Sequence, residues 1–318
     1  MISRERRRMI GKRVLQVVPV LLLVTFFSFI LVHLSPVDPA LLLAGENPTP
    51  AQIEEIRRFY GFDQPLIVQY GKWLWNVLHG DLSISMLSRE PVVSTIASKF
   101  PATLLIVVYG MVIAVVVGAP LGIWAAAKPG SFADQFATAV ASFGVAVPYF
   151  WVGMVLVLVL GLQLGLFPAT GAVPFSKDPW GAIHAATLPA IALSMSGIAE
   201  IVRQLRASLL EVLSSNYVRT LRAKGLPASA ILWRHGLKNV GITLVTVIGL
   251  VFNRKLGATV VIETVFAIPG TGSAIVYATV NKDFVVVQGI ILLFAVIVVS
   301  VNLLTDLAYA LLDPRVED

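Results

Sequence analysis

The sequence predicts an all-α polytopic membrane protein with six transmembrane helices and a small extracytoplasmic region between the first two. Hydrophobic residues make up 57% of the 318-residue chain and charged residues only 13%, whereas a typical soluble domain has about 25% charged residues. The apolar residues gather in blocks of about twenty or more, long enough to cross the hydrocarbon core as helices. Lys and Arg are concentrated in a few polar segments between these blocks, as the positive-inside rule expects of cytoplasmic loops.

Six apolar segments are expected to cross the bilayer: residues 14–34, 102–127, 136–167, 183–202, 240–262 and 284–305. The first follows a basic start and could pass for a signal peptide. It is 21 residues long, however, and "SPVDP" follows it instead of a small-residue cleavage site, so we expect a retained span. The third is long for one crossing, which predicts a strongly tilted helix or a kinked one. Pro148, which follows Gly144, is the expected kink point.

The distribution of basic residues fixes the expected orientation. Residues 1–13 contain six Lys or Arg, and residues 203–239 contain seven. Residues 35–99 form the longest polar stretch, yet they contain five Lys or Arg against seven Asp or Glu. The N-terminus and the 203–239 loop are therefore expected in the cytoplasm and residues 35–99 outside. Six crossings then return the C-terminal tail, residues 313–318, to the cytoplasm.

Two short helices are expected in the outer region. "TPAQIEEIRRFYGF" has a Thr-Pro start, apolar residues at helical spacing and a glycine at position 61 that suits a helix end. "QYGKWLWNVLHG" predicts a second amphipathic helix, whose tryptophans also suit the bilayer interface. We expect the chain to divide into residues 1–99, with the first span and the outer region, residues 100–312, with five spans, and the tail.

The stretch "YVRTLRAKGL", residues 217–226, lies in the most basic internal segment. It predicts a short amphipathic helix along the cytoplasmic face of the membrane, with Ser215 or Asn216 as its N-cap. Gly225 fits the left-handed position after a helix, and Pro227 prevents the helix from continuing. Two interpretations remain open at this point: an interfacial helix that obeys the positive-inside rule, or a docking helix for a cytoplasmic partner.

Three charged residues fall inside expected spans: Glu200 in the fourth, and Arg254 and Lys255 near the middle of the fifth. A charge at bilayer depth costs at least about 2.5 kcal/mol on insertion scales, so each should face a partner or water. They could line a translocation path that attracts a carboxylate or another anionic group. Alternatively, Arg254 and Lys255 could form an ion pair with Glu200 on the neighbouring span that serves packing only. In a third interpretation, the two basic side chains extend to the outer surface.

Several classes of chemistry find no support in the sequence. There is no cysteine, which excludes disulfides, thiolate metal sites and cysteine nucleophiles. None of the four histidines has a second ligand three or four residues away, so no metal site is expected. "IPGTGSA" lacks the Lys-Ser/Thr ending of a phosphate-binding loop. We therefore expect a non-catalytic protein. We attribute its net charge of +6 to basic residues in the segments that the positive-inside rule places in the cytoplasm, so no nucleic-acid partner is expected.

The basic stretch, followed by "LWRHGLKN", resembles the cytoplasmic signature loop of permease subunits of binding-protein-dependent ABC importers, in the dipeptide/oligopeptide/nickel branch. "SPVDPA", "GFDQPLIVQYGKWL" and "HGDLSIS" resemble the outer region of the B-type permease of that branch. "FPAT" resembles the start of its second span and "VIETVFAIPGTG", residues 261–272, its outer scoop loop. "VVQGIILL" and "NLLTDLAYALLDPR" resemble its last span and terminus. The resemblance covers nearly the whole chain.

The resemblance implies the type I ABC importer permease fold and a coupling helix that seats in a cleft of an ATPase subunit. The implied contact residues are Arg219, Thr220, Leu221, Arg222, Ala223, Lys224 and Gly225. Two positions depart from the family pattern. Leu221 stands where the family usually has alanine, and no proline follows Asn239 within a few residues. The second departure puts the exit of the loop in doubt.

The resemblance also implies partners: a second homologous permease subunit, two ATP-binding subunits or one fused ATPase, and an extracytoplasmic solute-binding protein. ATP and Mg²⁺ would be bound by the ATPase, with no cofactor in this chain, and the location would be a bacterial or archaeal cytoplasmic membrane.

Di- and oligopeptides are the expected substrates, with nickel chelates, glutathione, opines and oligosaccharides as alternatives. From another class, a gradient-driven secondary transporter would suit the three intramembrane charges but would be expected to show a repeat, and none is detectable. An anchored sensor is disfavoured because several spans occur without a cytoplasmic signalling domain.

Overall fold

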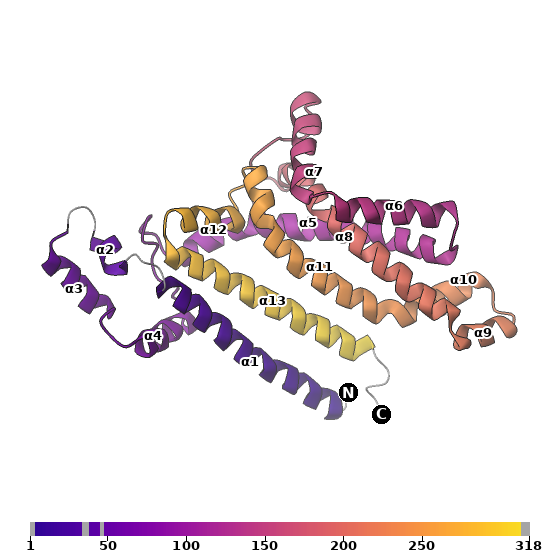
Figure 1. Cartoon of the computed structure of the whole chain (residues 1–318), viewed down its shortest axis with the longest axis horizontal. Coiled ribbons are helices and arrows are strands. Elements are labelled where there is room, and N and C mark those ends of the chain that lie inside the picture. Colours follow the sequence, from indigo (N-terminus) through magenta and orange to yellow (C-terminus); the bar gives the residue numbers. More distant parts are fainter. Residues whose placement is uncertain (1–3, 34–37, 45–47, 313–318) are drawn as a thin grey trace. The chain divides into compact units, whose positions relative to one another are not determined.

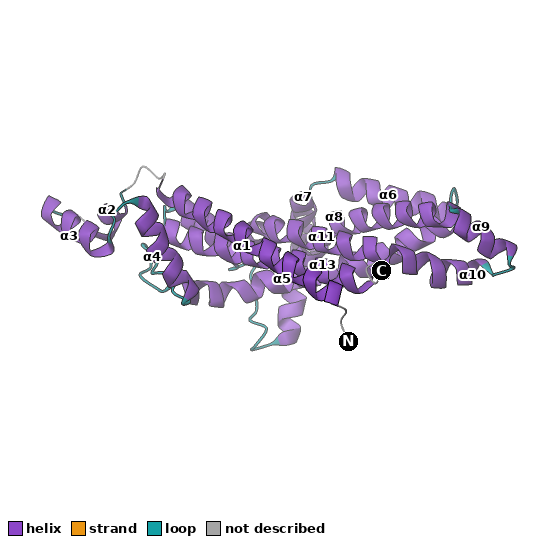
Figure 2. Ribbon diagram, turned by 90° about the horizontal axis from the view of Figure 1, so that it is seen from below, coloured by secondary structure: helices purple, strands orange, loops and turns teal. Residues whose placement is uncertain are grey.

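The computed structural model describes residues 4–33, 38–44 and 48–312, and the regular elements in these ranges are helices (Figures 1 and 2). They form two compact units. One contains residues 1–13, 101–273 and 300–318, and the other contains residues 14–100 and 274–299. In chain order the helices are α1 (Arg4–His33), α2 (Pro39–Ala44), α3 (Pro50–Tyr60), α4 (Leu66–Leu78), α5 (Val92–Ala127), α6 (Phe132–Ala146), α7 (Tyr149–Leu156), the π-helical η1 (Val157–Gln163), α8 (Pro179–Ser214), α9 (Asn216–Ala223), α10 (Ala228–Ala230), the π-helical η2 (Ile231–Gly236), α11 (Leu237–Val265), α12 (Thr271–Val280) and α13 (Phe284–Leu312).

Four helical stretches of the described chain are long and apolar enough to cross a membrane: Val92–Ala127, Pro179–Ser214, Ala228–Val265 and Phe284–Tyr309. They cover four of the expected spans but extend beyond them. The helix around residues 183–202, for example, continues to Ser214. An apolar run marks the part of a helix that can lie in lipid, and the backbone hydrogen bonds continue into the polar residues that follow.

The third expected span is broken. Helix α6 and the continuous α7–η1 stretch meet at an angle of 95°, so the pair is either one broken span or a re-entrant loop. Pro148 lies at the break and precedes α7, which confirms the predicted kink point. Val147 has an extended backbone, with φ −93° and ψ 126°, because a residue before proline is sterically disfavoured in the α conformation. With this pair the described chain has up to five candidate spans.

The first expected span lies on α1, where the apolar helical stretch Leu15–Ile30 is shorter than a full crossing. Residue 34, the end of that expected span, and the tail 313–318 lie outside the described residues. The structure therefore supports an all-helical membrane protein with four to five candidate spans, and the sixth crossing remains a prediction.

Helix α8 forms the centre of the larger unit. It packs along α6, α7 and α11 (Figure 1), and its buried side chains are mostly Ala, Leu and Ile. Small residues allow these helices to approach closely. A Cβ atom on Gly144 of α6, for instance, would lie 2.8 Å from the carbonyl oxygen of Met195 on α8. Close packing of small residues is the way that helices associate in lipid, where burial of apolar surface between them gains little.

The smaller unit contains both predicted outer helices. In α3, Thr49 and Gln52 form a capping box, and Gly61 ends the helix with φ +74°, as its sequence predicts. Helix α4 is the second one, and the hydroxyl of its Tyr70 lies 2.9 Å from that of Thr25 on α1. The buried Asp283, just before α13, accepts hydrogen bonds from the hydroxyl of Ser85 and from nearby backbone N–H groups. These contacts fasten the turn before α5 to the start of α13.

Candidate functional site

Helix α9 coincides with the basic stretch, and its two ends are fixed by local interactions. The side chain of Ser215 accepts a hydrogen bond from the backbone N–H of Val218, at 3.4 Å, which caps the start. At the other end, Gly225 has φ +79°. Its N–H donates to the carbonyl of Arg222 at 2.9 Å, and the N–H of Leu226 donates to that of Leu221 at 3.2 Å. This bond pair is a Schellman motif, so the predicted glycine stop is confirmed.

One face of α9 is fastened to the rest of the unit. Val218 is fully buried and Leu221 is partly buried. The hydroxyl of Tyr217 lies 2.8 Å from Nδ1 of His235 in η2, and a guanidinium nitrogen of Arg222 donates to the carbonyl of Leu213 at the end of α8, at 3.4 Å. These contacts tie α9 to both flanking helices, so a displacement of α9 would be passed on to α8 and to η2.

The other face of α9 is exposed and basic. Leu221 is the partly buried member of the seven predicted contact residues; the others are exposed, namely Arg219, Thr220, Arg222, Ala223, Lys224 and Gly225. Two large aromatic side chains in the same loop are also exposed, Tyr217 at 50% and Trp233 at 60%. Neither residue was expected in the site from the sequence, although large aromatic residues in a predicted cytoplasmic loop are a usable signal, because they are enriched at protein interfaces.

The three intramembrane charges separate into two environments. The guanidinium of Arg254 contacts Glu200 Oε2 at 3.0 Å, and Arg203, one turn along α8 from Glu200, contacts the same oxygen at 3.4 Å. Lys255 does not join this cluster. Its side chain is 3% exposed, and its ammonium donates to the Leu193 carbonyl and to the Ser196 hydroxyl. Neighbouring helical residues point about 100° apart, which explains why these two basic side chains part.

A buried carboxylate that the sequence analysis missed organises the segment after α11. Glu263 is fully buried and accepts from the hydroxyl of Thr103 at 2.6 Å and from the N–H of Ser273 at 2.7 Å. Thr103 in turn accepts from the N–H of Thr271 at 2.9 Å. An acidic residue in an apolar run just before "IPGTG" was a signal for such a role. The contacts connect the start of α5 in this unit with the loop that follows α11.

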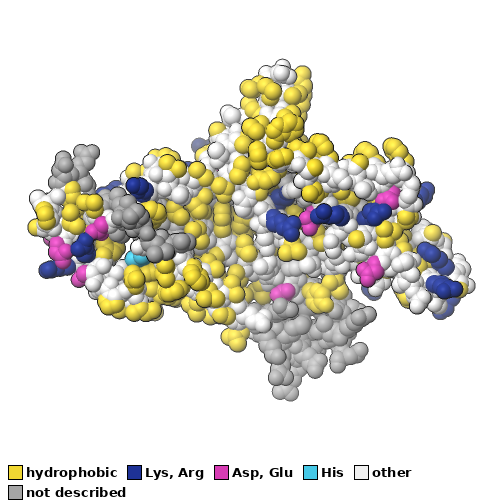
Figure 3. All heavy atoms as spheres, viewed as in Figure 1, with side chains coloured by type: hydrophobic (Ala, Val, Ile, Leu, Met, Phe, Trp, Pro, Cys, Tyr) yellow, Lys and Arg dark blue, Asp and Glu magenta, His cyan; other side chains and the backbone are white. Residues whose placement is uncertain are grey.

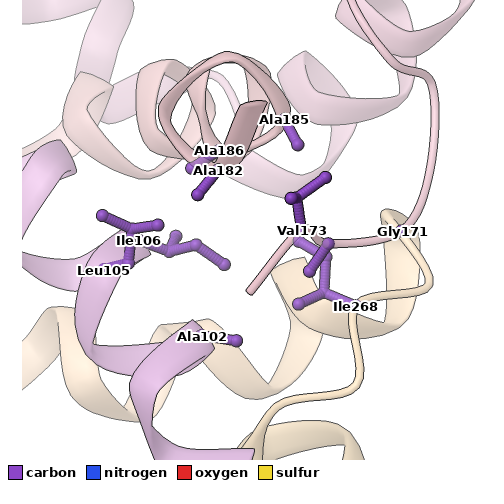
Figure 4. A pocket seen from close by; sticks show the side chains of 10 residues that line it. Ala102, Leu105, Ile106, Gly171, Val173, Ala182, Ala185, Ala186 and Ile268 are labelled. Carbon is purple, nitrogen blue, oxygen red and sulfur yellow. The ribbon is translucent and has the colours of Figure 1, made fainter. Parts of the chain in front are cut away.

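The cavity in Figure 4 is small and apolar. It has a volume of about 20 Å³ and lies between α5, the first turns of α8, the 171–173 segment and Ile268. A single water needs roughly 10–15 Å³ by this measure, so the cavity is far too small for a solute. Within the described residues no group of three or more His, Asp or Glu could hold a metal ion.

Comparison with known proteins gives consistent results. Residues 118–318 match the family described as binding-protein-dependent transport system inner membrane component, and residues 7–107 match its N-terminal family. The dipeptide transport system permease protein DppB of Escherichia coli is 38% identical, over 94% of this chain and 96% of its own length. The oligopeptide transport system permease protein AppB of Bacillus subtilis is 35% identical, over 96% and 98%.

Among solved structures, the methionine ABC transporter MetNI in inward-facing conformations has a chain that aligns with a TM-score of 0.56. The alignment covers 69% of this chain and 96% of that one, at 16% identity. At this identity the likeness concerns the fold, which is that of an ABC transporter permease.

Proposed function

The chain belongs to the family of binding-protein-dependent transport system inner membrane components, and we propose that it is the peptide-transporting permease subunit of an ATP-driven importer. It is a multi-pass inner-membrane protein and a non-catalytic subunit. In this proposal it forms half of the translocation path, and a second homologous permease forms the other half. Its relatives transport dipeptides and oligopeptides according to their names, which favours peptides over the other substrates of the branch.

The observation that carries the proposal is the shape of α9. It is a short helix with a buried anchor at Val218, a basic exposed face and a glycine stop in the left-handed conformation. We assign residues 219–225 to contact with a separate ATP-binding subunit. Closure of the ATPase pair would displace α9, and the displacement would pass through its fastened face to α8 and η2. Alternating access then follows if α9 docks differently in the ATP-bound and ATP-free states.

The proposed topology has six crossings, with α1 as the first and the α6–η1 segment as the third. Both termini and α9 would lie in the cytoplasm, and the outer helices α2 to α4 outside, where a solute-binding protein delivers the substrate. The balance of basic residues between 203–239 and 35–99 supports this orientation.

A single cysteine tests the docking face and the topology together, because the natural chain contains none. Ala223→Cys places a thiol on the exposed face of α9, and Ser94→Cys places one on the exposed surface near the start of α5. With a benzophenone maleimide attached, the first should cross-link to an ATP-binding chain and the second should not. In intact cells a membrane-impermeant maleimide should label only the second.

The complex should also be purified gently from its own membrane and its chains identified by mass spectrometry. ATP-binding chains, a second permease and a solute-binding protein are expected, and the bound ligand of the last would identify the substrate. Purification of this chain alone, with uptake that persists after ATP depletion, would refute the importer and favour a gradient-driven transporter.

A further inference from the structure

The exposed faces of the helices in the larger unit differ in character. Along α5 the large exposed side chains are apolar, as is typical of contact with lipid: Leu104, Val108, Val112, Val116, Val117 and Trp124. From residue 246 of α11 onward the exposed residues also recur at helical spacing, but they are mixed: Thr246, Leu250, Arg254, Gly257, Val261 and Thr264. In Figure 3 a group of dark blue and magenta side chains lies over α8 and α11, bordered by yellow apolar ones. We call this face of α11, with Glu200 and Arg203 of α8, the mixed face.

The charged cluster of the mixed face carries an excess of one positive charge. Arg254 and Arg203 both contact Oε2 of Glu200, so two guanidinium groups share one carboxylate oxygen. Arginine stays protonated at every physiological pH. The side chains of Arg254 and Arg203 are 65% and 60% exposed. An exposed guanidinium such as that of Arg254, near the middle of an expected span, is costly in lipid, so the face requires water or polar groups opposite it.

Arg254 has both the donors and the room to bind an anion. Its guanidinium carries five N–H donors, and within the described chain only Nη1 has a hydrogen-bond partner, namely Glu200. Gly257 lies one turn further along the same face, and a Cβ atom there would meet nothing within 4 Å. The guanidinium is largely exposed, and its remaining N–H donors suit a planar carboxylate, which arginine binds through two parallel hydrogen bonds.

We propose that the mixed face lines the translocation path and that Arg254 binds a carboxylate of the transported peptide as it passes. The inference rests on the proposed peptide-importing function and names the group that the path recognises. Glu200 is the counter-ion of Arg254 when no peptide is present. When Arg254 turns to the substrate, Arg203 keeps Glu200 paired, so the exchange leaves no isolated carboxylate. Lys255 takes no part, because it is buried against α8.

A local measurement tests the charge of the mixed face and its accessibility to water without relying on transport. Gly257→Cys places the chain's only thiol beside Arg254. The complete complex is placed in nanodiscs, in which both sides of the membrane are accessible. It is treated with a methanethiosulfonate reagent that carries either a negatively charged sulfonate or a positively charged trimethylammonium group. Labelling is measured from the mass of this chain. Rates are divided by those of a small thiol in solution.

We expect the normalised rate for the anionic reagent to exceed that for the cationic one several-fold, and Arg254→Gln to remove this preference. Leu250→Gln, which introduces the same side chain one turn away on the same face, should leave it intact. The proposal is overturned if neither reagent labels the thiol, or if the cationic reagent is preferred, or if the preference survives Arg254→Gln.

Uptake then tests the role toward substrate. In proteoliposomes with all subunits, Arg254→Gln should slow ATP-dependent uptake of a free-acid peptide about tenfold, which is the scale of one charge-assisted hydrogen-bonded contact. Arg254→Lys keeps the charge but loses the paired N–H donors, so its rate should lie between those of the glutamine variant and the wild type. Lys128→Gln, which removes a positive charge from the exposed turn between α5 and α6, outside the mixed face, should be close to the wild type. A lysine variant as slow as the glutamine variant, or no loss in either, would overturn the inference. Absence of ATP-dependent peptide uptake in the wild-type complex would instead refute the proposed function, while the labelling result would stand by itself.

Discussion

Substitutions at Gly225 can isolate the contribution of the α9 stop to coupling. Gly225 has φ +79°, and a Cβ atom there would meet nothing within 4 Å, so packing within the chain does not oppose a side chain. The cost of Gly225→Ala is therefore that of the left-handed backbone, about 1–2 kcal/mol for an L-residue. An energy of this size lowers the ratio of native to non-native helix ends by a factor of roughly 5–30.

The substitutions should follow the backbone preference of the new residue. Asparagine tolerates the left-handed conformation best, alanine less well, and a β-branched valine poorly. Proline is fixed near φ −65° and also removes the N–H that donates to the carbonyl of Arg222. We therefore expect uptake to fall in the order Gly, Asn, Ala, Val, Pro, with no detectable uptake for Pro.

The assay is ATP-dependent uptake of a labelled peptide by proteoliposomes that contain the whole importer, normalised to the amount of this chain. Gly241 provides a matched control, because it lies inside α11 and a Cβ atom there also meets nothing within 4 Å. Gly241→Ala should not reduce uptake, since alanine favours a helix more than glycine does. Normal transport by all Gly225 variants would refute a role of the left-handed backbone in coupling. An asparagine variant as impaired as the valine variant would refute it too, because uptake would then follow side-chain volume and not backbone conformation.

Three further predictions concern stability and are measured as the thermal midpoint of the purified protein in detergent. Glu263→Ala leaves a buried hydroxyl and a backbone N–H without their carboxylate, so we expect a loss of about 2–6 kcal/mol; an unchanged midpoint would contradict this role. Asp134 is buried and accepts two hydrogen bonds from Arg206, at 2.5 and 2.9 Å. Asp134→Asn should cost about 1–3 kcal/mol, and a midpoint that rises would refute the estimate. Gly144→Val should separate α6 from α8 and cost about 1–3 kcal/mol, whereas wild-type stability would show that the helices adjust freely.

The sequence was sufficient to predict helix ends and breaks that depend on interactions between neighbouring residues. The N-cap, amphipathic face and glycine stop of α9 all arise within twelve residues, and the break at Pro148 follows from the steric demand of proline on its neighbour. Gly61 as the end of α3 is a third example. In each case the residue restricts its own backbone or that of an adjacent residue, so no knowledge of the tertiary structure is needed.

The sequence was insufficient to predict contacts and exposures that depend on the packing of helices distant in the chain. The rotation of about 100° between neighbouring helical residues predicts that Arg254 and Lys255 point apart, but it does not predict that one meets a carboxylate on α8 and the other a carbonyl and a hydroxyl. Their partners depend on the packing of α8 against α11, which no local pattern specifies. The exposure of Trp233 has the same origin, since it depends on how η2 lies against the end of α8.

The contacts of Glu263 also set an order of events during synthesis. Thr103 and Glu263 are 160 residues apart in the chain, and ribosomes add about 5–20 residues per second. The start of α5 therefore waits roughly 8–32 s for the carboxylate that will hold it. During that interval the hydroxyl of Thr103 lacks its carboxylate partner, whereas the backbone groups around it are paired within α5. A chain that stalls before residue 263 cannot complete this contact, so α5 is held in this way only once nearly all of α11 has been synthesised.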